Sequence, residues 1–133
     1  MPTILCLSSL LFGTSSVHAY VLGMDVLPEA FLALTVISTM NHALSSRNNA
    51  IRVIDWTVAH CLFVYQMYVA ILYAQNCLAL WVSWICGFEI VRVFHVMGIY
   101  KNDNVLMHGW MHVVCVIASH ALMLSCSHTN SQT

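Results

Sequence analysis

The chain has 133 residues, of which 60% are hydrophobic and only 7% are charged, against roughly 25% charged residues in a typical soluble domain. So few polar side chains cannot cover a water-facing surface, which argues against a soluble globular enzyme and makes lipid the solvent for much of the chain. Four Lys and Arg residues against five Asp and Glu residues give a formal net charge of −1 without any basic block, so nucleic acid is not an expected partner.

The first apolar segment, residues 3–23, has two interpretations. It is long enough for a first membrane helix, but Val17-His18-Ala19 near its end resembles a signal-peptidase site. No Lys or Arg precedes the apolar stretch, unlike in a usual signal peptide. The sequence therefore leaves open a retained helix and a cleaved signal segment.

Four further runs are long and apolar enough to cross a bilayer, which takes about 20 helical residues because every backbone N–H and C=O must be satisfied internally. They cover residues 26–46, 51–74, 77–99 and 105–126, and a polar tail follows at 127–133. The connections are short, so neighbouring helices should be antiparallel. The sequence thus predicts an all-α fold, a single polytopic transmembrane helical bundle with four or five spans.

The positive charges predict how this multi-pass bundle is oriented in its membrane. Arg47 and Arg52 flank the connection before the run 51–74, and Arg92 and Lys101 lie toward the connection before the run 105–126. Because positive charges favour cytoplasmic loops, both connections are expected on the cytoplasmic side. The C-terminus is then expected on the non-cytoplasmic side.

The remaining reactive and charged side chains have simpler interpretations. The cysteines form no C-x-x-C pair and lie mostly in apolar runs, so we interpret them as small buried hydrophobic residues rather than a disulfide framework. They are Cys6, Cys61, Cys77, Cys86, Cys115 and Cys126. Glu89 and Arg92 are three residues apart and are expected to neutralise each other.

A layer of polar residues lies near one end of the predicted helices. An ionisable side chain near the centre of a membrane helix costs roughly 2.5–3.5 kcal/mol, so each one calls for a partner or a role. At 1.5 Å per residue, four of them lie within roughly 5–11 Å of one membrane face. They are His42, Asp55, His108 and His112.

Spacing adds a second constraint on this layer. His108 and His112 are four residues apart, so both imidazoles project from one side of the last helix, and Ser38 has the same spacing to His42. If these helices meet, the layer holds three imidazoles, one carboxylate and one hydroxyl. Three neutral His ligands and a water around Zn²⁺ form a known type of open catalytic site.

These motifs resemble the signature of the CREST superfamily of membrane proteins, which includes alkaline ceramidases, the progestin and adiponectin receptors and enzymes that remodel GPI-anchor lipids. The resemblance rests on Ser38-Thr39-Met40-Asn41-His42, on Asp55 and on His108-Gly109-Trp110-Met111-His112. Members of the superfamily have seven spans, so this chain would be a shortened relative.

The resemblance implies a function and a role for each motif residue. Zn²⁺ would be bound by His42, His108 and His112. Asp55 would handle the proton of the metal-bound water, and Ser38 would stabilise the metal site or the oxyanion. The implied reaction is hydrolysis of a lipid amide or ester, with a membrane lipid as the substrate.

Two other functions fit the same sequence. His60 and His112 lie at comparable depths on different helices, as the axial ligands of a haem would. Alternatively, the chain is a non-enzymatic small multispan protein, such as a receptor-like protein, an assembly factor or a pore, whose polar residues serve helix association. In that case the histidines need not converge, and Asp55 could simply pair with Arg52 or cap its helix.

Three further histidines have no ligand role in the zinc interpretation. His95 lies at nearly the depth of the polar layer and could be a hydrogen-bond partner of a ligand or a packing residue. His60 and His120 lie deeper in the membrane.

Overall fold

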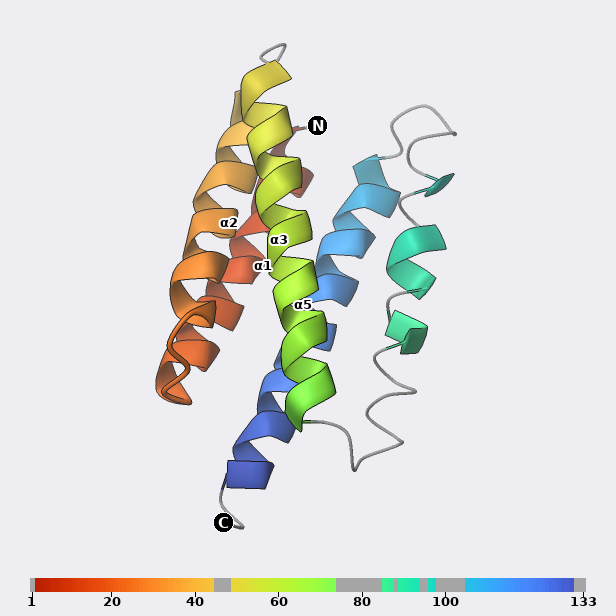
Figure 1. Cartoon of the computed structure of the whole chain (residues 1–133). Helices are drawn as coiled ribbons and strands as arrows, with labels where there is room; N and C mark the ends of the chain where they lie inside the picture. Colours follow the sequence, from red (N-terminus) through yellow and green to blue (C-terminus); the bar gives the residue numbers. More distant parts are fainter. Residues whose placement is uncertain are drawn as a thin grey trace.

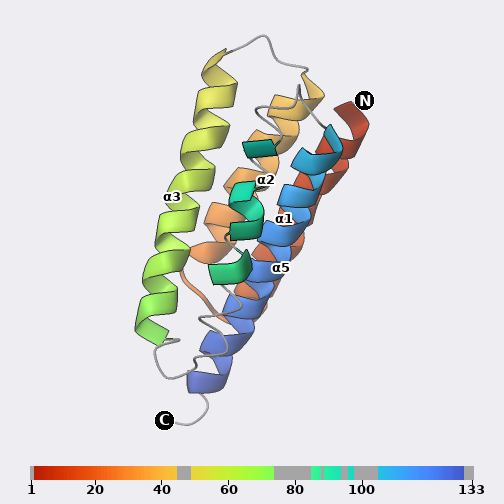
Figure 2. The ribbon, with the colours of Figure 1, turned by 90° about the vertical axis from the view of Figure 1, so that its right-hand side faces the viewer.

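The computed structural model describes residues 2–44, 49–73, 85–87, 89–93, 96–97 and 105–130, and all regular secondary structure in these ranges is helical. Four long helices account for most of it: α1 (Pro2–Val21), α2 (Leu27–Ala43), α3 (Asn49–Tyr73) and α5 (Val105–Asn130). They pack side by side as a bundle (Figures 1 and 2). The prediction of an all-α fold is confirmed for this part of the chain.

Three of the long helices contain stretches long and apolar enough to cross a membrane, at Ile4–Val21, Ala50–Leu72 and Val105–Ser127. Helix α2 forms within the predicted run 26–46 but has 17 residues, which corresponds to about 25 Å against a hydrocarbon core of about 30 Å. Most of the predicted run 77–99 lies outside the described residues, although 85–87, 89–93 and 96–97 are helical. The number of spans therefore stays a prediction.

A glycine in the left-handed region joins α1 to α2. Gly23 has a φ of 68°, its N–H donates to the carbonyl of Tyr20, and the N–H of Met24 donates to the carbonyl of Ala19. These two bonds form a Schellman motif, which satisfies the last carbonyls of a helix and reverses the chain. Pro28 then occupies the first turn of α2, where its missing N–H is no loss.

Small residues bring α1 and α2 close together. Ser9, Ser15 and Ala19 are completely buried, and a Cβ added at Gly13 would lie only 3.7 Å from Cγ2 of Thr35. Close approach at small residues is typical of the interfaces between membrane helices. The larger core residues around this interface are Phe12, Leu27, Phe31, Leu34, Leu62, Val116 and Met123.

The helix directions determine which ends share one layer. Helices α1, α3 and α5 run the same way and α2 runs opposite to them (Figures 1 and 2). The C-terminal end of α2 therefore lies at the same end of the bundle as the N-terminal ends of the other three. The helical pieces 85–87, 89–93 and 96–97 lie beside α5, where a Cβ added at Gly87 would lie 3.6 Å from Cβ of Ala118.

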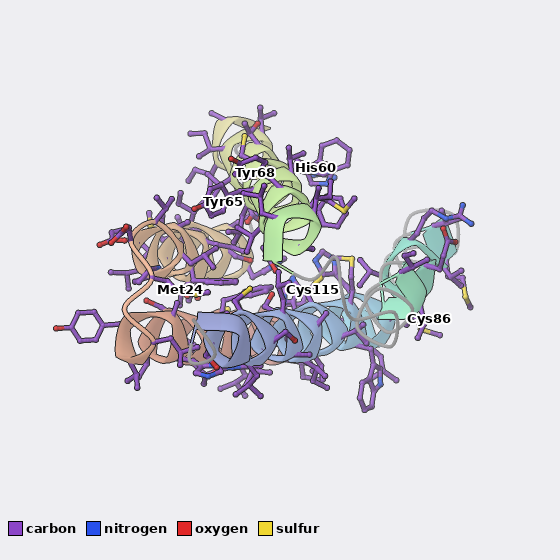
Figure 3. All side chains as sticks on the ribbon, turned by 60° about the horizontal axis from the view of Figure 1, so that its bottom comes forward. Met24, His60, Tyr65, Tyr68, Cys86 and Cys115 are labelled. Carbon is purple, nitrogen blue, oxygen red and sulfur yellow. The ribbon has the colours of Figure 1, made fainter. Side chains whose placement is uncertain are left out.

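The described cysteines are all free, as predicted, but their burial is not uniform. Cys126 is buried and Cys115 lies half-buried where α3 and α5 face each other, whereas Cys61 and Cys86 are exposed (Figure 3). The prediction that all are buried is therefore wrong for these two, because the long helices also expose many of their apolar side chains. Cys77 lies outside the described residues.

The expected neutralisation of Glu89 is confirmed. Arg92 binds its carboxylate at 2.8 Å on the exposed side of the segment. His95 lies outside the described part of the chain.

Candidate metal centre

Three histidines meet at the end of the bundle where α2 finishes and α5 begins. The ring centroid of His42 lies 5.1 Å from that of His108 and 5.5 Å from that of His112. The centroids of His108 and His112 are 4.8 Å apart. One nitrogen from each ring can be chosen so that all three lie within 4.8 Å of one another. The convergence predicted from depth and spacing is therefore present.

The donor atoms fit a metal ion. Nitrogens bound to one tetrahedral zinc at 2.0–2.1 Å lie about 3.3 Å apart, so the three donor atoms, which lie within 4.8 Å of one another, would have to approach by at most about 1.5 Å to bind one ion. Nε2 of His42 is buried and has no hydrogen-bond partner among the described residues. A buried polar atom without a partner is unfavourable, and a bound cation would supply the missing interaction. Three imidazoles suit zinc, copper, iron or nickel.

The predicted carboxylate lies beside this histidine cluster. Nδ2 of Asn41 donates to Oδ2 of Asp55 at 2.8 Å. The Asp55 carboxylate also interacts with the Ser38 hydroxyl and lies within electrostatic range of His108. No ion pair between Arg52 and Asp55 occurs in the described part of the chain. All five residues of the predicted layer thus gather in one region.

Helix α1 contributes two contacts to the site that the sequence did not reveal. Oγ of Ser8 lies 2.9 Å from Nδ1 of His112, and Oγ of Ser9 lies 3.0 Å from Oγ of Ser38. Both serines are buried, and the ring of Phe12, one turn further along α1, packs on His112 with centroids 5.3 Å apart. Serines in apolar helices usually serve close packing. Ser8 and Ser9 can be told apart from such packing residues only when the rotation of α1 about its own axis is known.

The two deeper histidines lie elsewhere. His60 is exposed on the side of α3 turned away from α2 (Figure 3), with its Nδ1 2.7 Å from the carbonyl oxygen of Trp56. His120 contacts His18 of α1, Nδ1 to Nδ1 at 2.6 Å. His112 is buried among the other two cluster histidines. These ring contacts favour a three-histidine group over an axial pair formed by His60 and His112.

Comparison of the chain with protein-family models, with curated proteins and with solved structures finds no match in any of the three. The resemblance to the CREST superfamily therefore stays a prediction carried by the motif residues. The described residues establish a group of three histidines that could hold a metal ion, with a carboxylate beside it. They also establish an all-helical arrangement in which three apolar helices are long enough to span a membrane.

Proposed function

We propose that the chain is a membrane-embedded zinc-dependent hydrolase that cleaves a lipid amide or ester. The observation that carries the proposal is the convergence of His42, His108 and His112, with Asp55 beside them. Packing between helices alone does not require three histidines to direct their donor nitrogens into one region. Nor does helix packing explain why a buried ring nitrogen of His42 has no hydrogen-bond partner among the described residues.

The surroundings of the site support a lipid substrate. Asp55 on α3 is flanked by the exposed apolar side chains of Ile54 and Trp56, and the half-buried His108 lies between exposed Leu106 and the exposed Trp110 two residues further along α5. An acyl chain moving in the bilayer along these helices would therefore reach the polar layer from the side. The charge pattern of the loops predicts that this occurs from the cytoplasmic leaflet.

The protein groups have distinct tasks in such a reaction. Bound zinc would activate a water molecule and polarise the carbonyl of the substrate. Asn41 holds one carboxylate oxygen of Asp55, so the carboxylate is oriented to accept the proton of the attacking water and to return it to the leaving amine or alcohol. The Ser38 hydroxyl, next to Asp55, supplies a hydrogen-bond donor for that carboxylate or for the oxyanion.

The metal is tested first, on detergent-purified protein. Wild type should contain about one zinc per chain, and His112→Ala should contain none, because two imidazoles are too few for a stable site. His60→Ala is the matched control, since this histidine lies on the exposed side of α3, and it should keep its zinc. Equal zinc contents in wild type and His112→Ala would remove the basis of the proposal.

The reaction is tested with a ceramide and with a carboxylic ester lipid in mixed micelles. Asp55→Asn should keep zinc but lose about 10²–10⁴-fold in hydrolysis, the usual contribution of a general acid and base. If wild type binds zinc but releases no fatty acid from either lipid, the metal serves structure, which is the non-enzymatic alternative.

A further inference from the structure

The contact between Ser8 and His112 determines which ring nitrogen of His112 is available. Oγ of Ser8 lies 2.9 Å from Nδ1 of His112 and 3.0 Å from the carbonyl oxygen of Leu5. A serine hydroxyl has one proton and can donate only once. If that proton goes to Leu5, the Ser8 oxygen can only accept from His112, whose Nδ1 must then carry the hydrogen.

The neighbouring hydroxyls leave the Leu5 carbonyl open to the proton of Ser8. An ionised carboxylate only accepts hydrogen bonds, so the Ser38 hydroxyl donates to Asp55 and accepts from Ser9, 3.0 Å away. Ser9 is then not donating to the carbonyl of Leu5, although its Oγ lies 2.8 Å from that oxygen. One lone pair of the Leu5 carbonyl accepts from the backbone of the helix, and the second is open to the Ser8 hydroxyl, whose bond to this carbonyl is 3.0 Å long.

We infer that Ser8 is a positioning residue that holds His112 in its Nδ1–H form and so directs the Nε2 lone pair of His112 toward the metal. This inference rests on the proposed zinc site. It follows the general rule that a ligand histidine donates its second N–H to a neighbouring acceptor, which fixes both the tautomer and the ring orientation. Here the acceptor is a hydroxyl on α1, a helix that carries none of the predicted ligands.

Zinc affinity measures this role directly. Loss of such a partner typically weakens metal binding 10–100-fold, so Ser8→Ala should raise the zinc dissociation constant by that factor. Ser15→Ala is the matched control, because Ser15 is also fully buried on α1 but lies seven residues, or about two turns, from Ser8. Ser8→Thr retains the hydroxyl and should restore affinity close to that of wild type.

The tautomer gives a second measurement that needs no metal. In metal-free protein with ¹⁵N-labelled histidine, long-range ¹H–¹⁵N correlation spectra distinguish Nδ1–H from Nε2–H, and the His112 signals are those absent from His112→Ala. Wild type, Ser15→Ala and Ser8→Thr should show the Nδ1–H form. Ser8→Ala should lose this preference, which a purely structural serine would not affect.

The two sets of variants separate the two proposals. If His112→Ala keeps its zinc, the zinc site itself is wrong. If His112→Ala loses zinc while Ser8→Ala binds it as tightly as wild type and keeps the Nδ1–H form, the zinc site stands and the role of Ser8 is wrong.

Discussion

Asn41 links the carboxylate of Asp55 to α2, the helix that carries His42. Ser38, Asn41 and His42 are three and four residues apart, so they share one face of α2. The three side chains reach Asp55 and the histidine cluster from that face. Contacts with Ser38 and Asn41, on the same face of α2 as His42, thus determine where the Asp55 carboxylate lies relative to His42.

We expect the hydrogen bond between Asn41 and Asp55 to be energetically important. Hydrogen bonds to charged groups contribute about 1.5–3 kcal/mol, so Asn41→Ala should lower the free energy of unfolding by about that amount. A double-mutant cycle with Asp55→Ala, measured by denaturant unfolding in detergent, isolates the pairwise coupling. Zinc content should stay unchanged, because the side chain of Asn41 bonds Asp55 and makes no hydrogen bond to a predicted ligand among the described residues.

The control for this cycle lies on the exposed side of α3. The Thr57 hydroxyl donates to the carbonyl of Val53 within its own helix and has no bond to Asn41 or Asp55 in the described part of the chain, so Asn41→Ala combined with Thr57→Ala should be additive. A coupling energy near zero between Asn41 and Asp55 would contradict the assigned role.

At the level of helices, depth and spacing were enough to predict the site residues on α2, α3 and α5. His42 lies near the end of its helix, and Asp55 and His108 lie near the start of theirs. Because α2 runs opposite to α3 and α5, these three ends lie at the same end of the bundle. The contribution of α1 was not predictable in this way, because Ser8 and Ser9 look like packing residues until the rotation of α1 about its axis is known. The signal-peptide pattern of the same segment also left its presence in the bundle open.

Helix α1 approaches α5 at Gly109, which lies between the two histidines of the last motif. A Cβ at this position would lie 3.6 Å from Cγ2 of Ile4 and 3.9 Å from Oγ of Ser8. These are ordinary contact distances, so Gly109→Ala should leave zinc affinity close to wild type. Gly109→Leu adds three more carbons and should push Ser8 away from His112.

We therefore expect Gly109→Leu to weaken zinc binding and to cost about 1–3 kcal/mol in stability through overpacking. Isothermal titration with zinc and denaturant unfolding measure the two effects on the same samples. Trp110→Leu is the control for a large change at the next position, since Trp110 is exposed. Unchanged zinc affinity in Gly109→Leu would show that α1 can move without disturbing the site.

Across the whole molecule, α1 supplies polar partners to α5 at two levels. At the end with the histidine cluster, Ser8 contacts His112. Toward the other end, Nε2 of His120 lies 3.0 Å from Oγ1 of Thr14, and its Nδ1 contacts His18. These bonds join the two helices over most of the length of α1, in addition to the apolar core around Phe12.

This packing favours the retained helix over the cleaved signal. Cleavage after Ala19 would remove Ser8, Ser9 and Phe12 together, and with them a partner of His112 and part of the core. We expect the chain, expressed in cells with a membrane-insertion pathway, to keep this segment and to show the full mass of 14.9 kDa plus any C-terminal tag.

Intact-mass measurement tests this with one matched variant. Signal peptidase needs small residues around its cleavage site, so Val17→Phe would block cleavage, and the exposed position of Val17 on α1 leaves room for the larger ring. If α1 is retained, wild type and Val17→Phe both keep residues 1–19. A wild type that lacks these residues while Val17→Phe keeps them would show that the mature bundle forms without α1, and the assigned role of Ser8 would fall with it.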